Sequence, residues 1–212
     1  FEIEYRDCEP QPWTQERKDS IIAEISKAQP HEINDEIFFD DNGNNLLHRA
    51  VIMRSPEVIT ALLEKGLNIN FPVQNITRNE RNEIIGLEAN RYTPLHNALS
   101  ESGICLPTLE TVEALLKFPN HLGSESLDIN RVVNDEEDPN PLEFLLHYCD
   151  EMVAKGLDAL PIIKLLVEHG AGCRDQEQLD SIINDLSEVK DNQEMAAGIV
   201  TYLKEHPPIL AK

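Results

Sequence analysis

Residues 91–99 read "RYTPLHNAL". Pro94 suits the first turn of a helix, because the N–H that proline lacks has no partner there in any case. The residues that follow carry apolar side chains at the spacing of one helix face: Leu95, Ala98 and Leu99. His96 stands inside this stretch, and histidine is a common catalytic and metal-binding residue. The fold and the function both depend on whether His96 performs chemistry or maintains a repeated backbone shape.

The stretch occurs again twice in altered form. Residues 45–51 read "NLLHRAV" and residues 140–146 read "NPLEFLL", with a leucine at the same place in each copy: Leu47, Leu95 and Leu142. Each copy is followed by a second apolar stretch: "EVITALLEKGLNIN" at 57–70, "ETVEALLKF" at 110–118 and "LPIIKLLVEHGAG" at 160–172. The phrases "LNIN" at 67–70 and "LDIN" at 127–130 also resemble each other.

Each copy therefore predicts a helix, a turn, a second helix and a loop. The apolar residues of 162–167 indicate that the second stretch of the last copy is helical, and Gly170 suits the position that ends the helix. One such pair of helices cannot bury its apolar faces alone, whereas stacked pairs bury them against one another.

This pattern resembles the ankyrin repeat, whose signature is T-P-L-H-x-A in a unit of about 33 residues. The second copy matches the signature fully, at Thr93, Pro94, Leu95, His96 and Ala98. The first copy keeps Leu47, His48 and Ala50. The third copy is the weakest, since Asn140, Glu143 and Leu145 replace Thr, His and Ala. The resemblance covers roughly residues 40–175.

The resemblance implies an all-α fold, an ankyrin-repeat solenoid of stacked helix-turn-helix units with long inserted loops and degenerate capping units. We expect an N-terminal helical cap at 1–39, three irregular repeats within 40–175, and a C-terminal degenerate repeat or cap at 176–212. The three repeats span about 40–70, 88–130 and 135–172. In the ankyrin family the histidine of the tetrapeptide forms local hydrogen bonds, so the resemblance implies that His48 and His96 are structural.

The copies lie farther apart than the family's unit length allows. The repeated leucines stand 48 and then 47 residues apart, against the roughly 33 expected. The excess falls in four segments, of which 71–89 extends the loop that normally forms the β-hairpin finger; the others are 102–107, 119–125 and 150–159. Long inserted loops are often functional, but drift in loop length also accounts for them.

The two ends of the chain read as caps that shield the stack. Residues 14–28 predict an amphipathic helix with Thr14 as its N-cap, and residues 32–39 predict a second, short helix. At the other end, 176–186 and 193–205 predict a final helix pair, which Pro207 and Pro208 terminate. We therefore expect about ten helices in one elongated, curved stack.

Composition narrows the class of partner. The chain has 212 residues, of which 41% are hydrophobic and only 5% aromatic, a mixture that favours helices packed on helices. The net charge of −21 repels phosphates and anionic lipid, so nucleic-acid and membrane-surface binding are not expected. The same charge attracts a partner with a basic patch. Solubility alone is the alternative reason for it.

The cysteines indicate a reducing compartment. Cys8, Cys105, Cys149 and Cys173 are far apart, and no CxxC occurs. No apolar run approaches the roughly 20 residues that span a bilayer. We interpret the chain, which begins at Phe1, as a fragment with a cytoplasmic location, or a location in the host cytosol if the parent is a secreted bacterial effector.

Residues that carry chemistry do not form a convincing catalytic group. His147 and Cys149 are two apart, and on a helix such positions point away from each other. His121, His147 and His169 lack the spacing of metal ligands, and the acidic run at 134–139 lacks that of a calcium loop. We therefore predict no enzymatic activity, no catalytic residues, no metal and no cofactor.

The resemblance also implies where a protein partner binds, because ankyrin proteins use their finger loops and the concave face of their first helices. By position, the first copy offers Asp41, Asn42, Asn44, Ile52 and Met53. The second copy offers Asn90, Tyr92, Ser100 and Glu101. The third copy offers Glu137, Pro139, His147 and Tyr148. Packing between adjacent units is the alternative role for Met53 and Tyr148.

The sequence thus predicts a monomeric, non-enzymatic module for protein–protein interaction. Two alternatives stay open: a part that recruits substrates for a larger enzyme, and a purely structural spacer. The irregular insertions also resemble those of ankyrin effectors from intracellular bacteria, with a eukaryotic cytosolic adaptor as the alternative origin.

Overall fold

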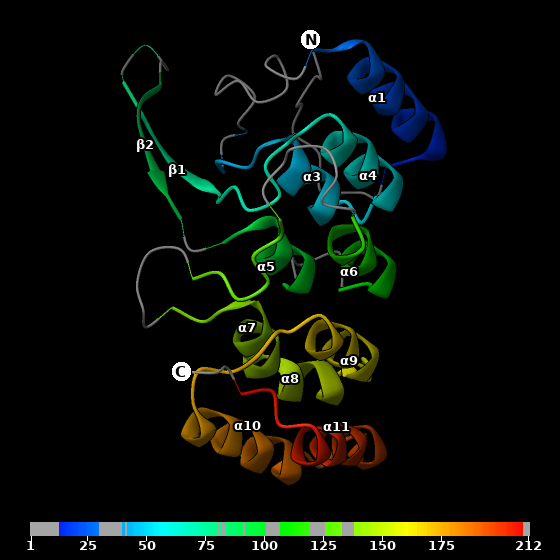
Figure 1. The fold of residues 1–212 in the computed structure, drawn as a ribbon, viewed down its shortest axis with the longest axis vertical. Coiled ribbons are helices and arrows are strands. Elements are labelled where there is room, and N and C mark those ends of the chain that lie inside the picture. The colour runs from blue at the N-terminus through cyan, green and yellow to red at the C-terminus, as the bar shows by residue number, and fades with distance from the viewer. Residues whose placement is uncertain are drawn as a thin grey trace. The chain divides into compact units, whose positions relative to one another are not determined.

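The computed structural model describes residues 13–29, 40, 42–79, 81, 84–90, 92–100, 107–118, 126–132 and 138–209. The chain forms two compact units (Figure 1). The first comprises Phe1–Asp128 with Val133–Asp138, and the second comprises Ile129–Val132 with Pro139–Lys212. Each unit has its own set of buried apolar side chains.

The first unit contains two stacked helix pairs. Its elements are α1 (Gln15–Lys27), α3 (Leu46–Ile52), α4 (Pro56–Glu64), β1 (Gln74–Arg78), β2 (Ile84–Ala89), α5 (Pro94–Leu99) and α6 (Leu109–Leu116). Helices α3 and α4 form one pair, and α5 and α6 form the next. Between the pairs, α3 contacts α5 and α4 contacts α6, while α1 covers α4. The sequence pattern of helix, turn and helix is confirmed here.

The second unit contains another such pair and the C-terminal helices. Its elements are α7 (Pro141–His147), α8 (Cys149–Ala154), α9 (Leu160–Glu168), α10 (Gln176–Glu188) and α11 (Gln193–Glu205). Helix α7 contacts α9, α10 contacts α11, and α11 also contacts α9. Helix α8 contacts α7, α10 and α11, so it is packed into the unit.

The predicted terminal helices are present where the structure describes the chain. Thr14 is the N-cap of α1, and its hydroxyl accepts a hydrogen bond from the Arg17 N–H at 3.3 Å. The final pair occurs as α10 and α11. The short helix predicted at 32–39 lies outside the described residues.

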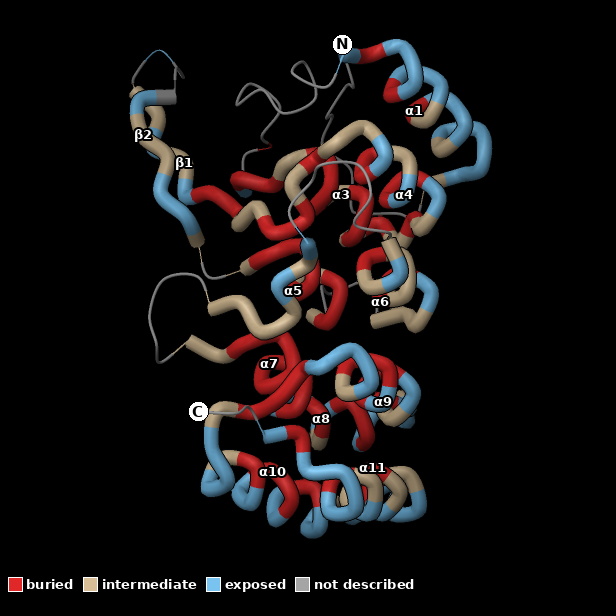
Figure 2. The backbone as a smooth tube through the Cα atoms, viewed as in Figure 1, coloured by how far each residue is buried: buried red, intermediate tan, exposed pale blue. Residues whose placement is uncertain are grey.

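The first helix of each pair is the more deeply buried one. Helices α3, α5 and α7 are buried over most of their length, whereas the described residues of β1 and β2 after Gln74 are half-buried or exposed (Figure 2). The repeated leucines Leu47, Leu95 and Leu142 have no exposed surface. Burying a leucine side chain stabilises a fold by about 1.5–3 kcal/mol, so this position contributes at every repeat.

An asparagine side chain connects each loop to the next. Within the first unit, the Asn70 amide donates to the Ser126 carbonyl at 2.7 Å and accepts from the Asp128 N–H at 2.8 Å. Within the second unit, the Asn130 amide donates to the Gly170 carbonyl and accepts from the Gly172 N–H, both at 3.0 Å. The two asparagines therefore make the same pair of bonds one repeat apart. They are the last residues of the phrases "LNIN" and "LDIN".

Two inserted segments have more structure than the sequence pattern indicated. Residues 71–89, expected to extend the finger loop, contain the antiparallel pair β1–β2, while the other described elements are helices, as in an α repeat fold. Residues 150–159, predicted as an inserted loop, contain most of α8, whose Met152 and Val153 are buried. The weak repeat signal hid this helix, which is only six residues long. The inserted segments at 102–106 and 119–125 lie outside the described residues.

Asn70→Ala is expected to lower the free energy of unfolding by about 1–3 kcal/mol, because it leaves the Ser126 carbonyl and the Asp128 N–H without their partner. Urea unfolding followed by circular dichroism measures this change. Asn184→Ala, an exposed site on α10, is the control and should change stability little. Equal stability of the two variants would show that the asparagine bonds contribute nothing.

Candidate interaction site

His48, His96 and Glu143 each lie in the first turn of a helix, namely α3, α5 and α7. Asn45, Thr93 and Asn140 are the N-caps, and each side chain accepts from the N–H three residues later. In return, the side chain of that third residue accepts from the N-cap N–H: His48 Nδ1 at 3.3 Å, His96 Nδ1 at 3.2 Å and Glu143 Oε2 at 3.0 Å.

This arrangement assigns His48 and His96 a structural role. Both side chains are buried, and the Nδ1 atom that accepts the backbone hydrogen bond cannot also bind a metal or take up a substrate proton. Burial lowers the pKa of His48 from its ordinary value of 6.5 to about 3. The nearby Phe71 backbone and the charge of Asp40 oppose that lowering of the pKa only in part.

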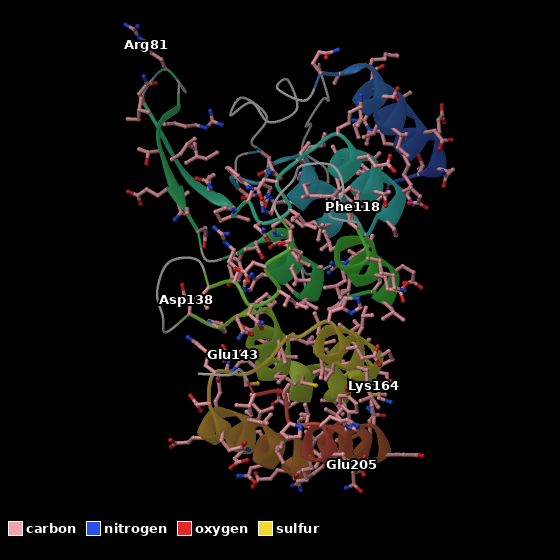
Figure 3. The ribbon with its side chains drawn as sticks, viewed as in Figure 1. Arg81, Phe118, Asp138, Glu143, Lys164 and Glu205 are labelled. Carbon is pink, nitrogen blue, oxygen red and sulfur yellow. The ribbon has the colours of Figure 1, made fainter. Side chains whose placement is uncertain are left out.

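Glu143, labelled in Figure 3, stands where the other two repeats have histidine, and its charge has an arginine partner. Its carboxylate has no exposed surface and lies 2.9 Å from an Nη atom of Arg174. The Arg174 backbone N–H and Nε also donate to it, at 2.8 Å and 3.0–3.1 Å. A buried carboxylate is tolerable only with such partners, so Arg174 is what permits glutamate at this position.

The candidate Cys–His pair has no catalytic arrangement. Cys149 is fully buried, whereas His147 is exposed at the end of α7. Burial, together with the charges of Asp150 and Asp158, raises the pKa of the Cys149 thiol to about 12. Since the thiolate is the nucleophile, a neutral buried thiol is unreactive at physiological pH.

The part of the chain that the structure describes shows neither a metal-binding cluster nor a membrane-spanning helix. There, no group of three or more His, Cys, Asp or Glu side chains is placed to hold a metal ion. His169, one of the histidines considered as a ligand, directs Nδ1 to the Leu165 carbonyl at 2.8 Å. Among the same residues, no helix combines the length and the apolar character needed to cross a bilayer.

Two of the residues expected at the partner surface are buried. Asn44 is 7% exposed, and its amide donates to both carboxylate oxygens of Asp40 at 3.2 Å. Met53 is 5% exposed at the end of α3. Neither side chain is therefore accessible in this structure, and the burial of Met53 fits the packing role that was the alternative. The burial of Asn44 and Met53 depends on the geometry of the adjoining turns, which the repeat signature does not specify.

The remaining expected residues of the first unit stay at or near the surface. Asn42 is exposed, and the side chains of Ile52, Asn90, Tyr92 and Ser100 are half-buried. The Asn90 amide donates to Asn75 across the base of the β-strand pair at 3.0 Å, and the Tyr92 ring meets His96 edge-on. Three expected contact residues lie outside the described residues: Asp41, Glu101 and Glu137.

The strands β1 and β2 form a finger hairpin that extends away from the helices of the first unit (Figure 1). Its base is fixed by backbone bonds: the Val73 N–H donates to the Tyr92 carbonyl at 2.8 Å, and the Gln74 N–H donates to the Gly43 carbonyl at 3.0 Å. Gly43 has φ +74°, and a Cβ there would overlap the Gln74 carbonyl. Only glycine therefore allows the turn at 40–44 to support the finger hairpin.

A β-bulge places an apolar side chain on the outside of this hairpin. Thr77 pairs with Gly86, but the next pair is Arg78 with Ile84, so Ile85 has no partner on β1. The Ile85 side chain is 64% exposed, the highest fraction among the described large apolar residues. Bulges often re-aim a side chain at a functional surface. Sequence reasoning missed Ile85, because its exposure depends on the strand register.

The expected contact residues of the second unit include an exposed aromatic. Tyr148 is 41% exposed at the junction of α7 and α8, and His147 beside it is exposed. The Tyr148 ring meets Phe144 and His147 edge-on, with centroids 5.2 Å and 5.0 Å apart. Pro139 is half-buried just before α7. The surface position of Tyr148 agrees with the sequence prediction.

One part of the chain, the first helix pair, matches a known protein family. The sequence model described as "Ankyrin repeat" matches residues 42–71, which span α3, α4 and the loop that follows. Residues 42–71 therefore form an ankyrin repeat. The ankyrin repeat is a non-catalytic fold that generally serves protein–protein interaction. A search of curated proteins returned no match to the chain.

The matched repeat contains the Asn45–His48 cap and ends at Phe71. The finger hairpin begins directly after it. The exposed bulge at Ile85 therefore belongs to the inserted segment that follows a repeat recognised by its family pattern.

His48→Gln is expected to flatten the pH dependence of stability. Below about pH 6.5 the unfolded chain protonates His48, whereas the folded chain does so only near pH 3, so stability falls as the pH decreases. The slope from this group is at most about 1.4 kcal/mol per pH unit. Urea unfolding of both proteins between pH 7 and pH 5 measures it. Parallel pH profiles would show that His48 titrates normally.

Arg174→Ala is expected to lower the free energy of unfolding by about 3–5 kcal/mol, because it leaves the buried Glu143 carboxylate without its counter-charge. The double variant Glu143→Gln, Arg174→Ala should regain part of this loss, since no buried charge remains. Thermal and urea unfolding of the three proteins test the expectation. A double variant no more stable than the single one would contradict it.

Proposed function

We propose that this protein is a non-enzymatic interaction module that binds a protein partner through its finger loops and the face of its first helices. The observation that carries the proposal is the exposed, bulged finger hairpin next to the matched ankyrin repeat. The family uses such fingers for binding, and here the finger is longer than the repeat requires and presents Ile85.

The chemistry of the finger hairpin supports contact with a protein. Ile76 and Leu87 pair across the strands and are only half-buried, since the described residues place no helix over them. Arg81 lies at the tip (Figure 3). A rigid two-stranded segment with a central isoleucine and an arginine resembles the apolar core and polar rim of protein interfaces.

We propose that the partner contacts accessible residues in each unit. In the first unit these are the finger hairpin with Asn42, Ile52, Asn90, Tyr92 and Ser100, and in the second unit they are Pro139, His147 and Tyr148. Asp41, Glu101 and Glu137 belong to the same proposal by sequence position. We further propose the division into caps and repeats stated from the sequence, a monomeric state and a cytoplasmic location. A role in recruiting substrates to a larger enzyme, or in a bacterial effector, would use this same surface.

Ile85→Ser is expected to weaken retention of the partner at least about fivefold, since truncating a central apolar contact costs 1 kcal/mol or more. The measurement is a pull-down from cell lysate, quantified by mass spectrometry, with wild-type and variant baits. Ile209→Ser is the matched control, because Ile209 is also an exposed isoleucine but lies outside the proposed surface.

Both variants should melt at the temperature of the wild type, because each side chain is largely outside the core. A partner lost by Ile85→Ser and kept by Ile209→Ser supports binding through the finger hairpin. A partner kept equally by both variants contradicts that role. The absence of any specifically retained protein would argue for the spacer alternative.

A further inference from the structure

A pocket of about 230 Å³ lies in the second unit, between the α7–α8 junction and α10. Its apolar lining comes from Leu146, Ile182 and Leu186. Its acidic lining comes from Asp150, Glu151 and Asp185, and Tyr148 and His147 complete it. The pocket therefore combines an apolar surface, one exposed aromatic ring and three carboxylates.

The negative charge of the three carboxylates is not neutralised by any side chain that lines the pocket. No lysine or arginine lines it. Among the described residues, none forms a hydrogen bond or an ion pair with the side chains of Asp150, Glu151 or Asp185. Elsewhere in the unit the buried carboxylate of Glu143 does have an arginine partner, Arg174. The three pocket carboxylates thus remain available to a cation supplied from outside.

The aromatic ring is held in place before any ligand arrives. Tyr148 follows the last residue of α7, and Phe144 and His147 contact its ring edge-on. With 41% of the residue exposed, a ligand in the pocket can reach the ring. A tyrosine ring attracts a cation placed over its face, and a fixed ring loses little conformational freedom on binding.

The inserted helix α8 creates the acidic side of the pocket. Asp150 and Glu151 lie in its first turn, and its buried Met152 and Val153 fix it to the unit. The Asn192 amide also donates to the Val153 carbonyl at 2.7 Å. The side chain of Asp185 faces the pocket from α10. The site thus exists because residues 150–159 are inserted between the two helices of the repeat.

We propose that this pocket binds an arginine side chain from a basic segment of the protein partner, an inference that rests on the proposed function. A guanidinium group can stack on the Tyr148 ring and donate to carboxylates on both sides, whereas its aliphatic stem contacts Leu146, Ile182 and Leu186. Arginine suits the pocket better than lysine, because the ammonium group of lysine is strongly hydrated and lacks a planar face.

The test uses a heptapeptide of alternating arginine and serine with the complete 212-residue chain. Two comparison peptides have the same sequence with citrulline or with lysine in place of arginine. Citrulline keeps the shape and removes the charge. Two-dimensional NMR of the ¹⁵N-labelled protein locates binding and yields the dissociation constant.

Three variants give the experiment its controls. Glu151→Gln with Asp185→Asn removes two charges from the pocket. Glu168→Gln with Glu205→Gln removes the same charge from exposed sites that do not line it. Tyr148→Ala removes the ring. We expect the pocket pair and Tyr148→Ala each to weaken the arginine peptide about fivefold or more, and the control pair to change it less than about twofold.

The proposal is supported if the arginine peptide changes the NMR chemical shifts only of residues 146–151 and 182–186. These changes should be lost in the pocket variants and should not occur with the citrulline peptide. Equal weakening by the pocket pair and the control pair would overturn the proposal, since the peptide would then bind by overall charge. Equal affinity for the lysine peptide would overturn the assignment of arginine. If the pocket does not bind the peptide, but the wild type retains a partner that Ile85→Ser loses, the arginine proposal fails and the proposed function stands.

Discussion

The start of each first helix is the constraint on which the rest of the fold depends. A helix leaves its first N–H groups without partners inside the helix, and here those groups are buried, where water cannot satisfy them. The reciprocal bonds of Asn45 with His48, Thr93 with His96 and Asn140 with Glu143 resolve this within four residues. Because the caps are satisfied internally, Leu47, Leu95 and Leu142 can occupy the fully buried positions that bring the helix pairs together.

The sequence predicts those parts of the molecule that local chemistry determines. Thr14 as an N-cap, the repeated helix pairs and the structural role of His48 and His96 all follow from short motifs, and the structure agrees. Features that depend on three-dimensional pairing could not be read in this way. The exposure of Ile85 depends on a bulge in strand register, and the burial of Met53 depends on packing at the end of α3. Helix α8 is too short to show a clear period.

The two surfaces with the most unusual chemistry both come from segments added to the repeat. The finger hairpin extends the loop after the matched repeat, and α8 lengthens the connection between α7 and α9. In each case a few buried anchors hold the addition: Val73 and Gln74 at the base of the hairpin, and Met152 and Val153 in α8. The repeats thus act as a rigid support, and the insertions present the side chains that distinguish this chain from a minimal array.

Glu143 has a consequence for how freely the repeats can be exchanged. A repeat that begins with Asn45–His48 or Thr93–His96 closes its cap with an imidazole, so the cap itself requires no counter-charge from another segment. The repeat that begins at Asn140 does require one, because its carboxylate pairs with Arg174, which belongs to the segment leading into α10. Those two segments are therefore bound to be inherited together. Recombination that separated the two segments would leave the Glu143 carboxylate buried without its counter-charge. The repeat at Asn140 therefore cannot be exchanged without the segment that carries Arg174.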